Sequence, residues 1–205
     1  MPHRMTVEPP DGALDEALMS RIAAGDQDAF TELFRRRRNE VYRVALFMTG
    51  GAAVAEDIAQ DVFLAVMRDA GRYEAGRSTV TAWLCGIARN HARRRLAQDG
   101  RIVRLADGDE PCHREPAVQR DLVAEIAAAQ HVEALRRAIL KLPVRYREVV
   151  VLCDLQELSY ADAATALDCA VGTVRSRLHR ARALLSAKMR DANSVRRSMI
   201  KGCLA

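Results

Sequence analysis

A segment near the C-terminus contains several arginines whose spacing suggests binding of an anionic partner. Between Thr173 and Arg190 the sequence has no acidic residue, and its polar side chains recur at helical spacing. Arginine can bond both a guanine edge and phosphate, so a helix with this face fits the major groove of DNA. The candidate DNA-contacting residues are Thr173, Arg175, Ser176, Arg177, His179 and Arg180. The alternative is a basic helix face that meets only solvent.

The residues around this segment favour DNA binding, because they form the pattern of a helix-turn-helix. Apolar residues at positions i, i+4, i+7 and i+11 predict one buried stripe, namely Val174, Leu178, Ala181 and Leu185. Upstream, Ser159 is suited to cap a short helix, with Asp162 three residues later as in a capping box. A short turn then leads into the basic helix, as DNA-binding helix pairs require.

A second basic segment, from Trp83 to Leu96, suggests contact with unpaired bases. Its predicted apolar side consists of Leu84, Ile87, Ala88 and Ala92. Its predicted polar side consists of Arg89, Asn90, Arg93 and Arg94. The stretch before it contains Tyr73, Arg77 and Ser78, and such aromatic, guanidinium and hydroxyl groups can hold single-stranded bases. The alternative places Tyr73 and Trp83 in the core, which is the favoured prediction for Trp83.

The segment from Val54 to Arg68 differs, because its exposed face is acidic. Its predicted buried stripe is Val54, Ile58, Val62 and Ala65. Its other face contains Asp57, Gln60, Asp61 and Leu64. An acidic face with one apolar residue suits docking onto a basic protein surface, although a solvated face is the alternative. Asp57 and Asp61 lie one turn apart and could share a metal ion, but no third ligand is evident.

The remaining metal-ligating residues favour neither a metal nor a cofactor. The spacing of Cys153, Cys169 and His179 matches no zinc pattern. The five cysteines are scattered and odd in number, which predicts reduced thiols in the cytoplasm. The N-terminus lacks the apolar core of a signal peptide, and no apolar run approaches the roughly 20 residues that span a bilayer.

Composition and breaks along the chain predict an all-α fold of two small domains joined by a flexible linker. Of 205 residues, 49% are hydrophobic and only 4% aromatic, and the net charge is +5. That balance favours helices and a nucleic-acid partner. Breaks at Gly25-Asp26, at Thr49-Gly50-Gly51 and from Arg72 to Ser78 divide the first domain into about four helices. The predicted boundaries are an N-terminal tail at 1–18, a first domain at 19–98, a linker at 99–120, a second domain at 121–190 and a C-terminal tail at 191–205.

These segments together resemble the sigma-70 family, specifically its small extracytoplasmic-function (ECF) group, over about residues 19–188. The first domain is similar to sigma region 2 through AFTELFRRRRNEVYRVAL, AEDIAQDVFLAVMR and TAWLCGIARNHARRRL. The second is similar to region 4 through LPVRYREVVVLCDLQELSYADAATAL and VGTVRSRLHRARALL. No segment similar to the intermediate region 3 is present, which is typical of this group.

The resemblance implies a transcription initiation factor that acts with core RNA polymerase, promoter DNA and an anti-sigma factor, in a stress or envelope response. It implies that Asp57, Gln60, Asp61, Phe63 and the neighbouring Leu64 grip the β′ clamp helices, and that region 4 meets the β flap. It implies −10 recognition by Arg89, Asn90 and Arg93, with a flipped base held by the stretch from Tyr73 to Thr81. It implies −35 recognition by the residues of the basic helix. No covalent chemistry is expected.

Two features depart from the family pattern. Asp168 and Ala170 stand in the turn where the family commonly has Gly and Pro, and Asp is expected to tolerate a left-handed conformation there. The Arg35–Arg38 run is heavier than expected for its helix, and solvated surface is the favoured interpretation.

Two other functions compete with the sigma-factor hypothesis. A free-standing repressor or activator would share the helix-turn-helix but would have no reason for the acidic docking face. A recombinase or nuclease would need clustered carboxylates or a nucleophile beside the basic surface, and only Asp57 and Asp61 approach that condition.

Overall fold

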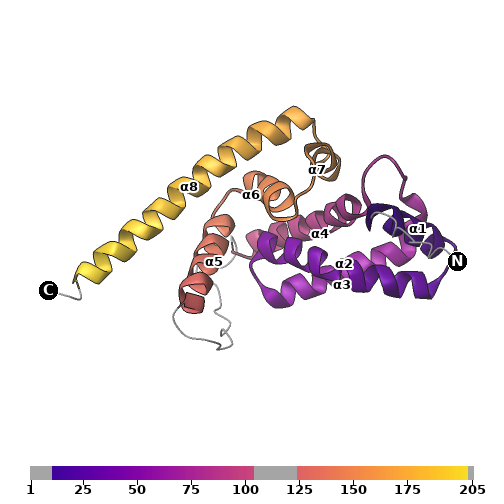
Figure 1. Ribbon diagram of the computed structural model, residues 1–205, viewed down its shortest axis with the longest axis horizontal. Coiled ribbons are helices and arrows are strands. Elements are labelled where there is room, and N and C mark those ends of the chain that lie inside the picture. The colour runs from indigo at the N-terminus through magenta and orange to yellow at the C-terminus, as the bar shows by residue number, and fades with distance from the viewer. Residues whose placement is uncertain (1–10, 104–123, 203–205) are drawn as a thin grey trace, which may run out of the picture.

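The computed structural model describes residues 11–103 and 124–202, and within them every regular element is helical (Figure 1). The first domain consists of α1 (Asp11–Ala23), α2 (Gln27–Thr49), α3 (Ala52–Asp69), a 3-10 turn at Ala70–Arg72, and α4 (Val80–Val103). The second consists of α5 (Ala124–Leu140), α6 (Val144–Val150), a π-helical turn at Val151–Leu155, α7 (Tyr160–Leu167) and α8 (Val171–Gly202). The all-α prediction is confirmed. None of the described helices is long and apolar enough to cross a membrane.

The helices of the first domain begin and end at the predicted breaks. Asp26 caps α2 by accepting hydrogen bonds from the amides of Asp28 and Ala29 at 2.9 and 3.0 Å. These bonds, with Arg21 beside them, lower the pKa of the Asp26 carboxyl. Gly50 ends α2 in the left-handed conformation at φ +88°, which a side chain would strain.

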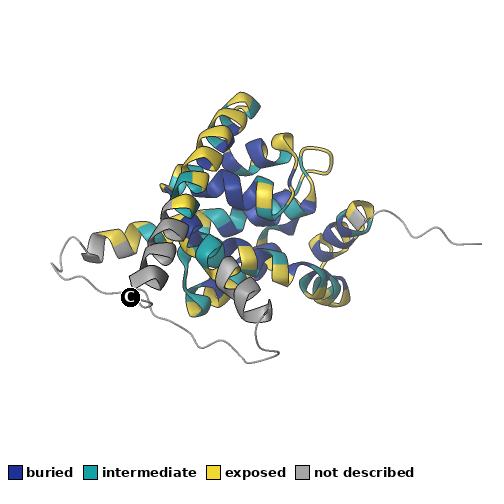
Figure 2. Ribbon diagram, turned by 60° about the vertical axis from the view of Figure 1, so that its left-hand side comes forward, coloured by how far each residue is buried: buried dark blue, intermediate teal, exposed yellow. Residues whose placement is uncertain are grey.

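The core of the first domain lies between α2, α3 and α4, and includes fully buried aliphatic side chains (Figure 2). Leu33, Val44, Val62 and Leu84 are each 1% exposed or less. One end of the core is aromatic, because Phe63 packs edge-on against Phe34 with ring centroids 4.8 Å apart. Apolar side chains at helical spacing are therefore buried where α3 and α4 pack on α2, and this burial stabilises the domain.

The N-terminal tail is shorter than predicted, because residues 11–18 belong to α1. A buried ion pair fixes this helix to α2: Asp15 is 1% exposed and accepts from Arg36 at 3.0 Å and from Arg37 at 2.5 Å. Solvated surface was therefore the wrong interpretation for the middle of the Arg35–Arg38 run, since Arg37 is itself buried.

Asp15→Asn is expected to destabilise the first domain by about 3 kcal/mol, because it removes the buried carboxylate charge that Arg36 and Arg37 share. Urea unfolding followed by circular dichroism measures the loss. Glu32→Gln is the matched control, since Glu32 pairs with Arg35 on the exposed surface and should cost about 0.5 kcal/mol or less. Equal midpoints for the two variants would contradict a structural role for Asp15.

The C-terminal tail predicted from residue 191 is also wrong, because α8 continues to Gly202. The sequence from 173 to 201 has neither Gly nor Pro, so nothing in it breaks the helix. The linker begins later than the predicted residue 99, since α4 continues through Gly100 to Val103. The rest of the linker lies outside the described residues.

The two domains pack against each other. Helix α7 lies against α4 so closely that a Cβ added at Gly86 would lie 3.5 Å from the Cα of Ala166. Near the end of α2, Arg147 from α6 donates to the carbonyl of Met48, and Arg136 from α5 donates to that of Gly50 at 2.5 Å. Two arginines of the second domain thus satisfy carbonyls at the end of a helix in the first.

Candidate nucleic-acid and polymerase interfaces

Helices α7 and α8 form the predicted helix-turn-helix. The apolar stripe of α8 is confirmed, with Val174, Leu178 and Ala181 each 2% exposed or less. Ser159 caps α7 by accepting from the amide of Asp162 at 3.0 Å. Asp168 ends α7 at φ +52°, which confirms that this residue adopts the left-handed turn.

The face of α8 opposite the stripe presents most of the predicted −35 residues to solvent. Arg175, Ser176, His179 and Arg180 are exposed, whereas Thr173 and Arg177 are half-buried. The Arg175 guanidinium lies 5.8 Å from the ring centroid of Tyr160, and the Arg180 guanidinium beside Tyr146 lowers the pKa of that tyrosine. The basic face is therefore largely open to solvent.

Arg182, one turn or less beyond this face, has a different environment. Its guanidinium binds Asp154 at 2.5 Å, which raises the pKa of Arg182. This pair ties α8 to the π-helical turn and neutralises the charge of Arg182, so the predicted DNA face ends near Arg180.

Helix α4 presents its apolar side to the core as predicted, with Leu84, Ala88 and Ala92 buried. Its polar side does not meet solvent alone. Arg89 Nε lies 2.6 Å from Glu148 Oε1 on α6, and Arg93 lies 3.5 Å from the same oxygen. Asn90 is exposed and accepts from Arg89 at 3.0 Å. The three residues predicted to recognise the −10 element are thus brought together, beside a carboxylate of the second domain.

The loop before α4 holds Tyr73 half-buried. Its hydroxyl donates to the carbonyl of Ser78 at 2.8 Å, and its ring packs edge-on against Trp83 with centroids 5.9 Å apart. Burial and the nearby Glu16 raise the pKa of Tyr73 to about 12. Arg77, by contrast, is exposed, and within the described ranges its guanidinium pairs with Glu74, three positions before it. Tyr73 and Trp83 therefore contribute to local packing, and Trp83 is partly rather than fully buried.

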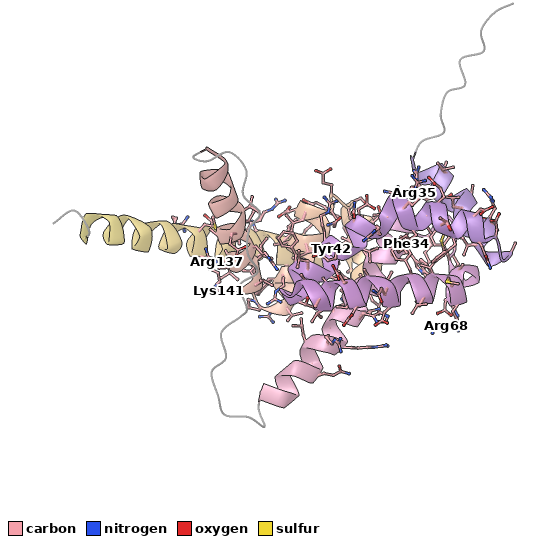
Figure 3. All side chains as sticks on the ribbon, turned by 90° about the horizontal axis from the view of Figure 1, so that it is seen from below. Phe34, Arg35, Tyr42, Arg68, Arg137 and Lys141 are labelled. Carbon is pink, nitrogen blue, oxygen red and sulfur yellow. The ribbon has the colours of Figure 1, made fainter. Side chains whose placement is uncertain are left out.

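The acidic face of α3 is exposed, with the Asp57 and Asp61 side chains 60% and 56% exposed, and Arg68 near the C-terminal end of this helix is labelled in Figure 3. Leu64 is 62% exposed, and Gln60 is also exposed. Two acids of this face meet α4: Asp57 pairs with Arg95 at 3.1 Å, and Asp61 lies 3.4 Å from His91.

Phe63 is the exception among the predicted docking residues. It is 3% exposed and belongs to the aromatic cluster of the core, so a direct grip on polymerase is the wrong prediction for its side chain. Met67, in contrast, is an exposed apolar residue on α3: its side chain is 57% exposed and lies one turn after Leu64. The exposed apolar pair at positions i and i+3 was visible in the sequence and was missed.

Two buried charged residues were also missed, and both belong to the interface between the domains. Arg147 and Glu148 are 9% and 2% exposed. Burial lowers the pKa of Arg147. Their signal in the sequence is the position of two charges beside the apolar run Val149–Leu152. In the described ranges, no three His, Cys, Asp or Glu side chains lie close enough together to hold a metal ion.

Comparisons with known proteins show the family to which the chain belongs. The sigma-70 region 2 model matches residues 33–102, and the sigma-70 region 4 model matches residues 132–185. The chain is 35% identical over 179 residues to the ECF RNA polymerase sigma factor SigE of Mycolicibacterium smegmatis, covering 86% of this chain and 68% of that protein. It is 33% identical over 183 residues to the ECF RNA polymerase sigma-E factor of Escherichia coli K12, covering 85% and 94%.

A solved structure has the same arrangement of helices. The sigma factor RpoE of Bartonella quintana, in complex with the anti-sigma factor NepR, superposes with a TM-score of 0.64 at 27% identity, covering 78% of this chain and 96% of that one.

Proposed function

The chain belongs to the ECF group of the sigma-70 family. We propose that three separate surfaces of this protein carry out the three binding functions of a sigma factor. A sigma factor binds core RNA polymerase and directs it to specific promoters. The acidic face of α3 would dock on the polymerase, the polar face of α4 would recognise and hold the −10 element, and the basic face of α8 would bind the −35 element.

The observation that supports this assignment most strongly is the distribution of charge over the exposed faces. The face of α3 combines Asp57 and Asp61 with the exposed Leu64 and Met67, which is the composition of a protein-docking surface. Between Thr173 and Arg190, α8 has no acid and several arginines, which is the composition of a DNA-binding surface. Opposite charge on separate helices lets one chain bind a protein and DNA together.

The chain needs no catalytic step of its own in this proposal. Opening a promoter requires a base to leave the stack at a cost of a few kcal/mol, which stacking and hydrogen bonds at α4 and its preceding loop would offset. The polymerase would supply the chemistry of RNA synthesis. By analogy with the Bartonella quintana complex, an anti-sigma factor is the regulatory partner that we expect.

Reconstituted run-off transcription tests the proposal. Transcript start sites mapped after overexpression of the chain supply the promoter, and the purified chain is then added to core RNA polymerase on that template. We expect a run-off product that depends on both the chain and the promoter. A chain that fails to bind core polymerase would refute the proposal, and a chain that binds the promoter tightly without polymerase would favour a repressor or activator.

A further inference from the structure

A cavity of about 540 Å³ lies where the start of α4 meets α2 and the connection that leads into α7. Its volume falls within the roughly 300–1,000 Å³ of small-molecule sites in proteins. The wall is formed by the first turn of α1, the middle of α2, two threonines at the start of α4, and residues 155–159 and 162. Among the described residues that line it, none belongs to the acidic face of α3 or the basic face of α8, so neither of those surfaces accounts for it.

Most charged groups of this cavity already have partners within the wall. Arg37 donates to both carboxylate oxygens of Glu40, at 3.0 and 3.2 Å. Asp162 accepts from the hydroxyl of Ser159 at 2.7 Å and from the amide of Thr79 at 3.1 Å. Charge-assisted hydrogen bonds of this kind satisfy these groups, so their role is to shape the wall.

Two charged residues of the wall differ from these. Arg43 on α2 and Glu157 before α7 are both exposed, and within the described ranges neither takes part in a salt bridge. A guanidinium binds a carboxylate strongly, and a carboxylate binds an ammonium group strongly. A cavity that offers both groups without partners suits a molecule that carries a carboxylate and an ammonium group.

The segment that holds Glu157 has two further unusual features. Glu157 adopts φ +54°, a left-handed conformation that is costly for a residue with a side chain and is found at ligand-binding sites. Beside it, Gln156 Nε2 is buried without an acceptor among the described residues, although buried amide donors are usually bonded. One wall of the cavity therefore combines a carboxylate held at a cost in backbone conformation with an amide that lacks a partner.

The charge of the wall decides which class of ligand fits. Two arginines of the wall stand against three acids, so a phosphate ester would bring more negative charge to an acidic cavity. A zwitterion adds no net charge. Leu155 and Leu158 supply an apolar part of the wall, and Leu158 is 9% exposed. The ligand is therefore expected to combine the two opposite charges with an apolar side chain.

We propose that this cavity binds a short apolar peptide with free termini: Glu157 binds its ammonium group and Arg43 binds its carboxylate. Leu155 and Leu158 pack against its side chains, and the amide of Gln156 donates to its peptide carbonyl. A dipeptide is the smallest such molecule that contains a peptide bond between the two charges. Binding of the peptide requires neither DNA nor RNA polymerase, so it can be measured on the free chain.

Isothermal titration calorimetry on the full-length chain tests the proposal, with the dipeptide Leu-Leu as the probe. N-acetyl-Leu-Leu lacks the ammonium group, and Leu-Leu amide lacks the carboxylate. Each blocked form should bind about tenfold or more weakly than Leu-Leu, because it loses a hydrogen bond between charged groups. Failure to bind Leu-Leu with a dissociation constant of about 1 mM or below would overturn the proposal, as would equal affinity for all three forms.

Two single variants assign the ends of the peptide to the two residues. Arg43→Gln should bind Leu-Leu about tenfold more weakly than wild type and should no longer distinguish Leu-Leu from its amide. Glu157→Gln should show the converse, with no difference between Leu-Leu and N-acetyl-Leu-Leu. Arg38→Gln is the matched control, because Arg38 is an exposed arginine of α2 outside the cavity wall and should leave all three affinities unchanged. Variants that keep the preferences of wild type would show that the peptide binds elsewhere.

Glu157→Gly separates binding from folding. Glycine adopts the left-handed conformation without strain, so the melting temperature of the free variant should equal or exceed that of wild type. Its affinity for Leu-Leu should nevertheless fall about tenfold or more. Leu-Leu should accordingly raise the melting temperature of wild type and not that of the variant. A folded variant with the affinity of wild type would overturn the role of Glu157 and with it the proposed site.

Discussion

Replacing Arg175 and Arg180 together by alanine is expected to reduce transcription from a promoter that depends on its −35 element by about 100-fold. Each good bidentate contact between arginine and a base is worth about 1–3 kcal/mol, and two such losses multiply in the rate of initiation. Both side chains are exposed on α8, so their removal takes away donors from the predicted DNA face. Run-off transcription measures the loss of −35-dependent initiation, and a separate titration measures the affinity of the variant for core polymerase.

The control for the double variant is Arg190→Ala, which removes one charge from α8 well beyond the predicted DNA face. Arg190 is exposed, and its guanidinium donates to Ser186 on the same helix. Its loss should change transcription about twofold or less, as expected for a general electrostatic effect. Affinity for core polymerase should be unchanged in both variants. A double variant that keeps its −35 dependence would show that α8 does not recognise that element.

Asp61→Arg combined with Leu64→Glu is expected to weaken binding to core polymerase by about 1,000-fold. The pair removes the exposed apolar anchor of the α3 face and replaces an acid by a base at its centre, and truncation of such central residues commonly costs about 2–4 kcal/mol each. Both side chains are exposed, so the fold should be retained. Fluorescence anisotropy with labelled chain and core enzyme gives the dissociation constant.

Glu56→Arg is the matched control for the docking variant, because it reverses a charge on the same helix. Glu56 is exposed, but its direction lies about 100° around the helix from that of Asp57. It should weaken binding about tenfold or less, and mainly at low salt, as expected of a charge at the rim. Equal losses in the two variants would show that binding depends on overall charge rather than on this face.

Elements set by local sequence were predictable, and the helix-turn-helix is the clearest example. Ser159 caps its helix through an amide three residues away, and Asp168 adopts the left-handed conformation that a short turn requires. The apolar stripe of α8 is buried because its period matches that of the helix. All three signals lie within a few residues of the structure that they determine.

Features that depend on distant partners were not predictable from one chain. Phe63 lies among the predicted docking residues in the sequence, yet its ring packs against Phe34 of another helix in the core. Arg37 belongs to a basic run typical of solvated surface, yet it pairs with Asp15 on α1 at a separation of 22 residues. Glu148 meets Arg89 across 59 residues. In each case the burial of a side chain is decided by a partner whose position only the folded chain reveals.

Helix α8 has a mechanical consequence that follows from its length. Its 32 residues span about 48 Å, and the predicted DNA contacts occupy only the first third. With no Gly or Pro between 173 and 201, the helix has no hinge, so it behaves as a lever whose far end projects from the body of the molecule (Figure 1). A tilt of a few degrees imposed at that end would rotate the basic face within the groove. The orientation of the basic face therefore depends directly on the position of the far end of the helix.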